Sequence, residues 1–126
     1  VPNHFRMASW LSRFVLRNTV EEDPMPQLFE ALRCAFIRLD GPPLPSCAPV
    51  WLALAFSALD EHGLLPSLDA FPEKAEAMQY MLAYATDAEL PPPDYSEDTW
   101  LALTRWSLDF LDKSELHVPD GLENAL

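Results

Sequence analysis

Residues 48–59 read Ala-Pro-Val-Trp-Leu-Ala-Leu-Ala-Phe-Ser-Ala-Leu, and eleven of these twelve residues are apolar. A helix that is apolar on every side has to lie in a protein core or in a membrane. Because a membrane span needs about 20 such residues, this stretch predicts a buried central helix over about residues 47–62. Asp60-Glu61-His62-Gly63 follows it, and we expect Gly63 to end the helix in the left-handed conformation that glycine readily adopts.

The composition of the whole chain favours further helices around that centre. Leu (21 residues) and Ala (15) dominate, whereas Ile (1), Val (5) and Thr (4) are scarce. Helices favour Leu and Ala, and strands favour β-branched residues, so the predicted fold class is all-α. With 126 residues, the chain has the size of one domain, and we expect residues 1–126 to share a single core.

Four other segments carry apolar residues at helical spacing. They are predicted to begin near His4, at Pro24 after an Asp23 cap, at Pro72, and at Asp94 or Ser96, with Asp94 and Glu97 at the spacing of a capping box. Proline clusters separate them, so we expect a compact bundle of four to five helices with proline-rich connecting loops. The predicted core residues are Trp51, Leu52, Phe56, Leu32, Phe36, Met81, Leu82, Trp100 and Leu108.

Both ends of the chain are predicted to contribute less to this core. Residues 1–6 are a possible extension before Met7, and residues 117–126, where the apolar pattern fades, are predicted to form a frayed tail. Arg13 and Arg17 interrupt any apolar stretch near the start of the chain, which argues against a signal peptide. We therefore expect a cytoplasmic protein without a membrane span.

The net charge of −12 is unevenly distributed along the chain. Residues 1–20 contain Arg6, Arg13 and Arg17 and no acid, which gives +3, so the rest of the chain carries −15. Nucleic acids and anionic membranes bind Lys and Arg, so the acidic part argues against both as partners. The basic first helix could lie on a membrane, although pairing of its arginines with the acidic body is the favoured interpretation.

No catalytic or metal-binding pattern emerges from the residues. The three histidines, His4, His62 and His117, lack the spacing of a metal site, and neither Cys34 nor Cys47 has an activating base nearby in the sequence. His62 follows the central helix, where an imidazole is favoured as a C-terminal cap. We therefore predict no enzymatic activity, no cofactor and no metal.

Acidic residues lie on both sides of the linker Leu90-Pro91-Pro92-Pro93. A stiff acidic loop with an aromatic residue suits a basic protein surface, because charge steers association and a buried aromatic residue contributes affinity. Ordinary solvation of these acids stays open as an alternative, and so does the match of residues 92–95 to the Pro-Pro-x-Tyr ligands of WW domains. The candidate partner-binding residues are Asp87, Glu89, Asp94, Tyr95, Glu97 and Asp98.

These observations predict a non-catalytic acidic protein that binds a partner protein with a basic surface. Its most concrete form is a bacterial immunity protein, an antitoxin or an inhibitor that masks that surface, by analogy at the level of class. The alternatives are a subunit or accessory domain of an enzyme complex and a secretion or assembly chaperone. A homodimer is also left open.

Overall fold

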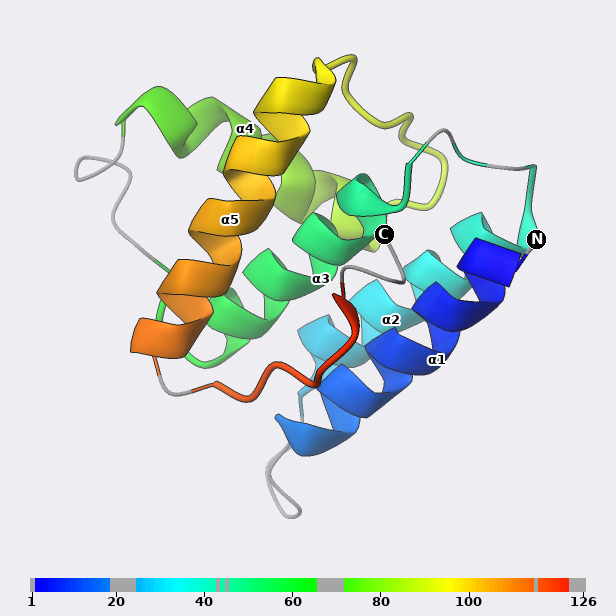
Figure 1. Ribbon diagram of the computed structural model, residues 1–126, viewed down its shortest axis with the longest axis horizontal. Helices are drawn as coiled ribbons and strands as arrows, with labels where there is room; N and C mark the ends of the chain where they lie inside the picture. The colour runs from blue at the N-terminus through cyan, green and yellow to red at the C-terminus, as the bar shows by residue number, and fades with distance from the viewer. Residues whose placement is uncertain are drawn as a thin grey trace.

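The computed structural model in Figure 1 is a bundle of helices, described for residues 2–18, 25–42, 44, 46–65, 72–114 and 116–122. Within these residues there are five α-helices and no strand. The helices are α1 (Pro2–Arg17), α2 (Pro26–Asp40), α3 (Ala48–Glu61), α4 (Pro72–Thr86) and α5 (Glu97–Lys113). The prediction of an all-α bundle is confirmed. No helix of the described part of the chain is both long and apolar enough to cross a membrane.

Helix α3 lies at the centre of the bundle, in contact with α2, α4 and α5 (Figure 1). All twelve residues from Ala48 to Leu59 are buried, as predicted for the central helix. Pro49 is tolerated in the first turn because the backbone N–H that it lacks has no helical partner there. The helix ends at Glu61, and Gly63 follows it in the predicted left-handed conformation, with a φ of 71°.

An aromatic cluster joins α1 to α3. The ring of Trp51 meets the rings of Trp10 and Phe14 edge-on, with centroids 4.9 and 5.2 Å away. The indole N–H of Trp51 donates to Ser107 Oγ in α5 at 3.2 Å. One side chain of the central helix therefore contacts two other helices, and its single polar atom has a partner.

The predicted core is only partly confirmed. Its fully buried residues are Trp51, Leu52, Phe56 and Met81, and its half-buried ones are Leu32, Leu82, Trp100 and Leu108. The assignment of Phe36 to the core is wrong, because its side chain is 38% exposed. Helix α2 buries its other side, with Leu28, Ala35 and Leu39, against the bundle, so Phe36 is left at the outer edge of that apolar stripe.

Two predicted helix starts need correction. Helix α2 begins at Pro26 instead of Pro24, and it uses proline at its first position; Pro24 and the predicted Asp23 cap lie outside the described residues. At the start of α5 the predicted Asp94 cap is wrong and the Ser96 alternative is confirmed, since Ser96 Oγ accepts the Thr99 N–H at 3.2 Å.

The predicted frayed tail, residues 117–126, is wrong for those of its residues that the structure describes. The indole N–H of Trp10 donates to the carbonyl of Pro119 at 3.1 Å. The side chain of Asn18 accepts the backbone N–H of His117 at 2.8 Å and donates to the carbonyl of the same residue at 2.6 Å. The segment after α5 therefore folds back onto α1, as Figure 1 also shows.

The residues before Met7 belong to α1. His4 is buried among them, and its Nε2 accepts the Leu44 N–H at 3.2 Å. Its Nδ1 lies 2.9 Å from the carbonyl oxygen of Leu39 and donates to it, because a neutral imidazole has one donor and one acceptor. His4 thus ties the first turn of α1 to the end of α2.

Candidate partner-binding surface

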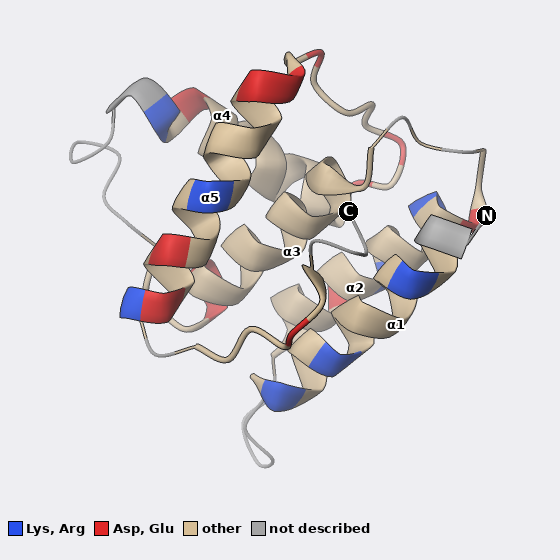
Figure 2. Ribbon diagram, in the orientation of Figure 1, with Lys and Arg blue, Asp and Glu red and all other residues tan. Residues whose placement is uncertain are grey.

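The six predicted partner-binding residues follow the connection from α4 to α5 and the first turn of α5, where the ribbon of Figure 2 is red at acidic residues. Five of them are exposed carboxylates, and Tyr95 is half-buried. We call this set the acidic surface: Asp87, Glu89, Asp94, Tyr95, Glu97 and Asp98.

The connection is held in one shape by hydrogen bonds from side chains of α4 and α2. The Tyr80 hydroxyl of α4 donates to the carbonyl of Pro91 at 2.6 Å. The Arg38 guanidinium of α2 donates to the carbonyls of Asp87 and Leu90. A loop that is already ordered loses little conformational entropy on binding, so these contacts favour recognition by the acidic surface.

Arg38 is a residue that the sequence analysis missed. Its guanidinium carbon lies 3.4 Å from the centroid of the Tyr84 ring, a cation–π contact that burial strengthens. Burial lowers the pKa of Arg38, and the neighbouring Tyr84 and Asp87 oppose that shift. No local signal could have found this role, because Asp87 lies 49 residues further along the chain.

The carboxylates of the acidic surface form no ion pair within the described part of the chain, although that of Asp87 lies near the Arg38 guanidinium. Its described ion pairs are Arg33–Glu30 and Lys113–Asp109, and neither involves this surface. One oxygen of Asp87 accepts the backbone N–H of Glu89 at 3.1 Å, which shapes the loop without cancelling charge. The surface therefore offers unpaired negative charge to a partner.

A hollow of about 220 Å³ lies beside these carboxylates. Its walls include Pro49, Pro92 and the rings of Tyr95 and Trp100, whose centroids are 5.0 Å apart. Burial raises the pKa of the Tyr95 hydroxyl, and the nearby Glu76 acts in the same direction, so Tyr95 stays a neutral hydrogen-bonding group at pH 7. Two aromatic rings in contact, here inclined by 50° to each other, and neighbouring carboxylates suit an Arg or Lys side chain.

His62 and the two cysteines have structural roles. The Nε2 atom of His62 lies 2.9 Å from the carbonyl oxygen of Asn18, so this ring caps the end of α1. Cys34 and Cys47 are free and buried, and burial raises the pKa of both thiols. Among the described residues, no three His, Cys, Asp or Glu side chains are grouped to hold a metal ion.

A second surface escaped the sequence analysis altogether. A hollow of about 620 Å³ lies between α1 and α2, with Phe5 and Phe36 among its lining residues. The signal that could have revealed it is that Phe5 and Leu16 fall outside the apolar stripe of the first segment, which Met7, Leu11 and Phe14 define.

No protein-family model matches the chain, and it has no match among curated proteins or among solved structures. The residues of the chain itself are therefore the basis for the function proposed next.

Proposed function

We propose that this chain is a non-catalytic acidic protein that binds a partner protein through the acidic surface and masks a basic surface on that partner. The observation that carries the proposal is the group of unpaired carboxylates on an ordered connection, beside the aromatic hollow of Tyr95 and Trp100. Charge would steer the encounter, and insertion of a basic side chain next to the rings would supply affinity.

The most concrete form is a bacterial immunity protein, an antitoxin or an inhibitor. Proteins of this class block the functional surface of a partner and need only a rigid surface that is complementary to it. The net charge of −12 supports a basic partner and argues against nucleic acid. Binding of residues 92–95 to a WW domain is a less favoured alternative, because Tyr95 is half-buried against Trp100.

A second candidate is a subunit or accessory domain of a larger assembly, including an enzyme complex. The observation that favours it is the exposure of large apolar side chains such as Phe5 and Leu16 on α1, which is typical of surfaces that another protein covers.

The test begins with recovery of a partner protein on the immobilised chain. The affinity of that partner for the chain is then measured at a series of salt concentrations. We expect affinity to fall as salt rises, and the double variant Glu97→Lys/Asp98→Lys to weaken binding by about tenfold or more. Asp112→Lys is the matched control, since Asp112 is exposed on the same helix outside the acidic surface, and it should leave the affinity nearly unchanged. Binding that responds neither to salt nor to the double variant would show that the proposal is wrong.

A further inference from the structure

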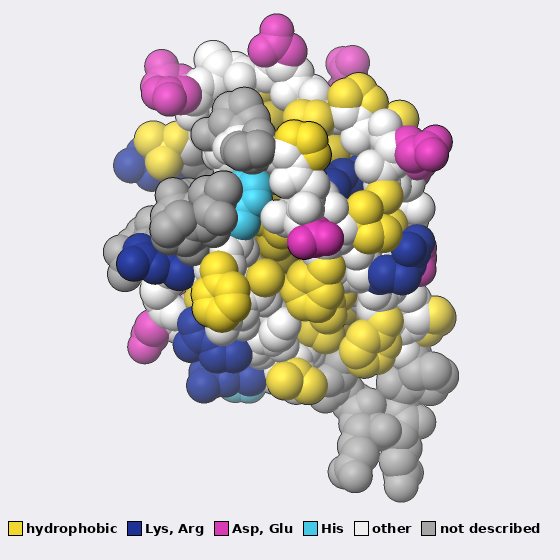
Figure 3. Space-filling model, turned by 90° about the vertical axis from the view of Figure 1, so that its right-hand side faces the viewer, with side chains coloured by type: hydrophobic (Ala, Val, Ile, Leu, Met, Phe, Trp, Pro, Cys, Tyr) yellow, Lys and Arg dark blue, Asp and Glu magenta, His cyan; other side chains and the backbone are white. Residues whose placement is uncertain are grey.

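The outer face of α1 and α2 carries large apolar side chains that are exposed. These two helices pack side by side, and Figure 3 shows hydrophobic side chains gathered on this side of the molecule. Phe5 is 79% exposed, Leu16 73% and Phe29 50%, beside the partly exposed Phe36 and Ile37. We call these five residues the apolar face.

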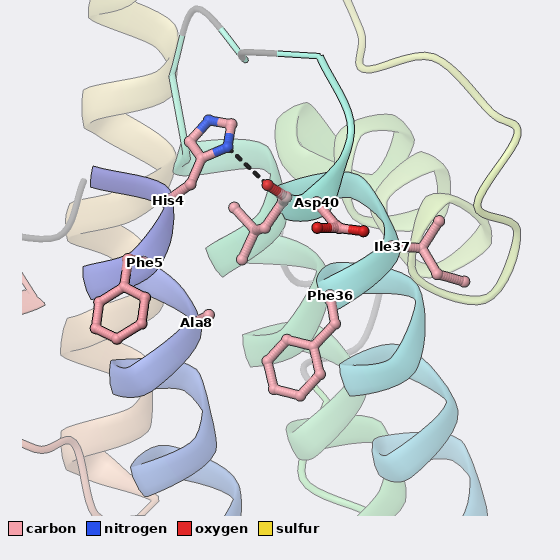
Figure 4. Close-up of a pocket in the computed structure, with 7 residues that line it drawn as sticks. His4, Phe5, Ala8, Phe36, Ile37 and Asp40 are labelled. Carbon is pink, nitrogen blue, oxygen red and sulfur yellow. Dashed lines mark hydrogen bonds between the residues drawn. The ribbon is translucent and has the colours of Figure 1, made fainter. Parts of the chain in front are cut away.

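The apolar face is hollowed rather than flat. The hollow of about 620 Å³ lies within it, and Figure 4 shows the ring of Phe5 from α1 and the ring of Phe36 from α2 on its two sides. Phe5 and Leu16 are eleven residues apart on one helix, which corresponds to about 16 Å along its axis. The apolar face therefore has the length of roughly three turns of another helix, and the hollow lies at the end of this face that holds Phe5 and Phe36.

One edge of this face is basic. Arg6, Arg13 and Arg17 are exposed on α1, and spacings of seven and four residues place them on one side of that helix. In Figure 2 the described ribbon of α1 is blue at basic residues and nowhere red. No described residue forms an ion pair with any of the three. In a chain of net charge −12, this edge is a local site for carboxylates.

The opposite edge, on α2, offers no comparable charge. Arg33 is already paired with Glu30, and the exposed carboxylate of Asp40 lies at one end of the hollow. A twofold contact between two copies would bring each face against itself. Asp40 is the carboxylate that lines the hollow, so the three arginines of each copy would outnumber it, and charge disfavours a second copy as the occupant.

We propose that the apolar face binds an amphipathic helix of a partner protein. The apolar side of that helix fills the hollow between Phe5 and Phe36, and its acidic edge lies along Arg6, Arg13 and Arg17. Apolar burial supplies affinity in this mode of recognition, and the charged edge sets the orientation. Ile37 borders a hollow that it shares with Glu89 of the acidic surface, but Phe5 and the three arginines belong to α1. The site takes a partner of the opposite charge, so it does not depend on the function proposed above.

The probes are two fluorescein-labelled peptides of about 18 residues, each with Leu at helical spacing on one side. One carries Glu along one edge, and the other carries Lys at the same positions. Fluorescence anisotropy with the full 126-residue chain measures their affinities. We expect the Glu peptide to bind, the Lys peptide to bind at least about tenfold more weakly, and the difference to shrink as salt rises.

Two variants and two matched controls locate the site. Phe5→Ser and Arg13→Glu should each weaken Glu-peptide binding by about tenfold. Leu101→Ser and Arg105→Glu change the same residue types at exposed positions of α5, and they should alter the affinity by less than about twofold. All four side chains are exposed, so circular dichroism of the variants should match that of the parent chain.

Several results would overturn the proposal. They are failure of the Glu peptide to bind, equal binding of the two peptides, and equal effects of the site variants and their controls. Self-association of the parent chain that is lost in Phe5→Ser would identify a second copy as the occupant instead. Displacement of the Glu peptide by a single-stranded oligonucleotide would identify a nucleic-acid site instead.

Discussion

At the scale of single residues, Trp51 links α1, α3 and α5 through one side chain. Its ring packs against Trp10 and Phe14, and its indole N–H donates to Ser107. Replacement by alanine removes the ring, leaves a cavity at the centre of the bundle and removes the N–H that Ser107 Oγ accepts, although this hydroxyl still donates to the carbonyl of Thr104. We therefore expect Trp51→Ala to lower the free energy of unfolding by about 3–5 kcal/mol.

Urea unfolding followed by circular dichroism measures this loss for Trp51→Ala. Leu101→Ala is the control, because Leu101 is 48% exposed on α5 and should cost no more than about 0.5 kcal/mol. A Trp51→Ala loss as small as that of the control would contradict the packing of the central helix described here.

Tyr84 has a buried hydroxyl without a hydrogen-bond partner among the described residues. Tyr84→Phe removes this hydroxyl and keeps the ring under Arg38. At pH 7 we expect the free energy of unfolding to stay the same or to rise by up to about 1 kcal/mol, because no hydrogen bond is lost. A clear loss of stability in a urea titration would mean that the hydroxyl has a partner in solution.

The same residue makes the fold sensitive to alkaline pH. Burial raises the pKa of Tyr84 above its ordinary value of 10.0, and that of Cys47 above 9.0. The folded chain then holds these protons more tightly than the unfolded chain. The stabilisation from these groups is therefore fully present below about pH 9. It is lost as the pH rises through their pKa values in the unfolded chain and then through their higher pKa values in the folded chain. Melting temperatures from pH 8 upward should show this fall, and Tyr84→Phe should show a shallower one beyond pH 10.

At the scale of elements, the segment after α5 depends on Asn18. The Asn18 side chain bonds both the backbone N–H and the carbonyl of His117. Asn18→Ala leaves these two groups without their partner, which we expect to cost about 1–3 kcal/mol. Hydrogen exchange of the His117 amide should accelerate accordingly.

The internal control for Asn18→Ala is the amide of Leu64, which bonds to the carbonyl of Leu59 at the end of α3. Its exchange should accelerate no more than the loss of global stability requires. Unchanged exchange at His117 would show that other contacts, such as that of Trp10 with Pro119, hold the segment by themselves.

At the scale of the whole molecule, charge opposes the fold more than it supports it. The net charge is −12, and the two described ion pairs, Arg33–Glu30 and Lys113–Asp109, are exposed and of little energetic weight. Added salt screens like-charge repulsion beyond about 10 Å at 0.1 M. We therefore expect the melting temperature to rise as sodium chloride increases from about 10 to about 200 mM. A fall would show that attractive pairs dominate.

The two proposed surfaces would bind two kinds of partner protein. The acidic surface suits a basic partner, and the apolar face with its arginine edge suits an acidic helix. Because they lie on different elements, α4–α5 and α1–α2 respectively, charge reversal at Glu97 should leave peptide binding at Phe5 intact. The two proposals can thus fail independently.

The sequence by itself determined the class of the fold and its centre. Residues 48–59 are apolar at every helical angle, so burial on all sides follows from local composition alone. The left-handed ending at Gly63 and the acidic residues around the proline linker are also local features. Each of these was predictable because the decisive residues are neighbours in the chain.

Only the tertiary structure decided which apolar residues are covered and which segments are held. Helical periodicity shows which side of α2 is apolar. How much of that side neighbouring helices bury depends on how the helices pack. Phe36 lies at its edge and stays partly exposed. The bonds of Arg38 to Asp87 and of Trp10 to Pro119 join residues 49 and 109 positions apart. Partners so distant meet only once the bundle has formed, since no local preference of either segment encodes the other.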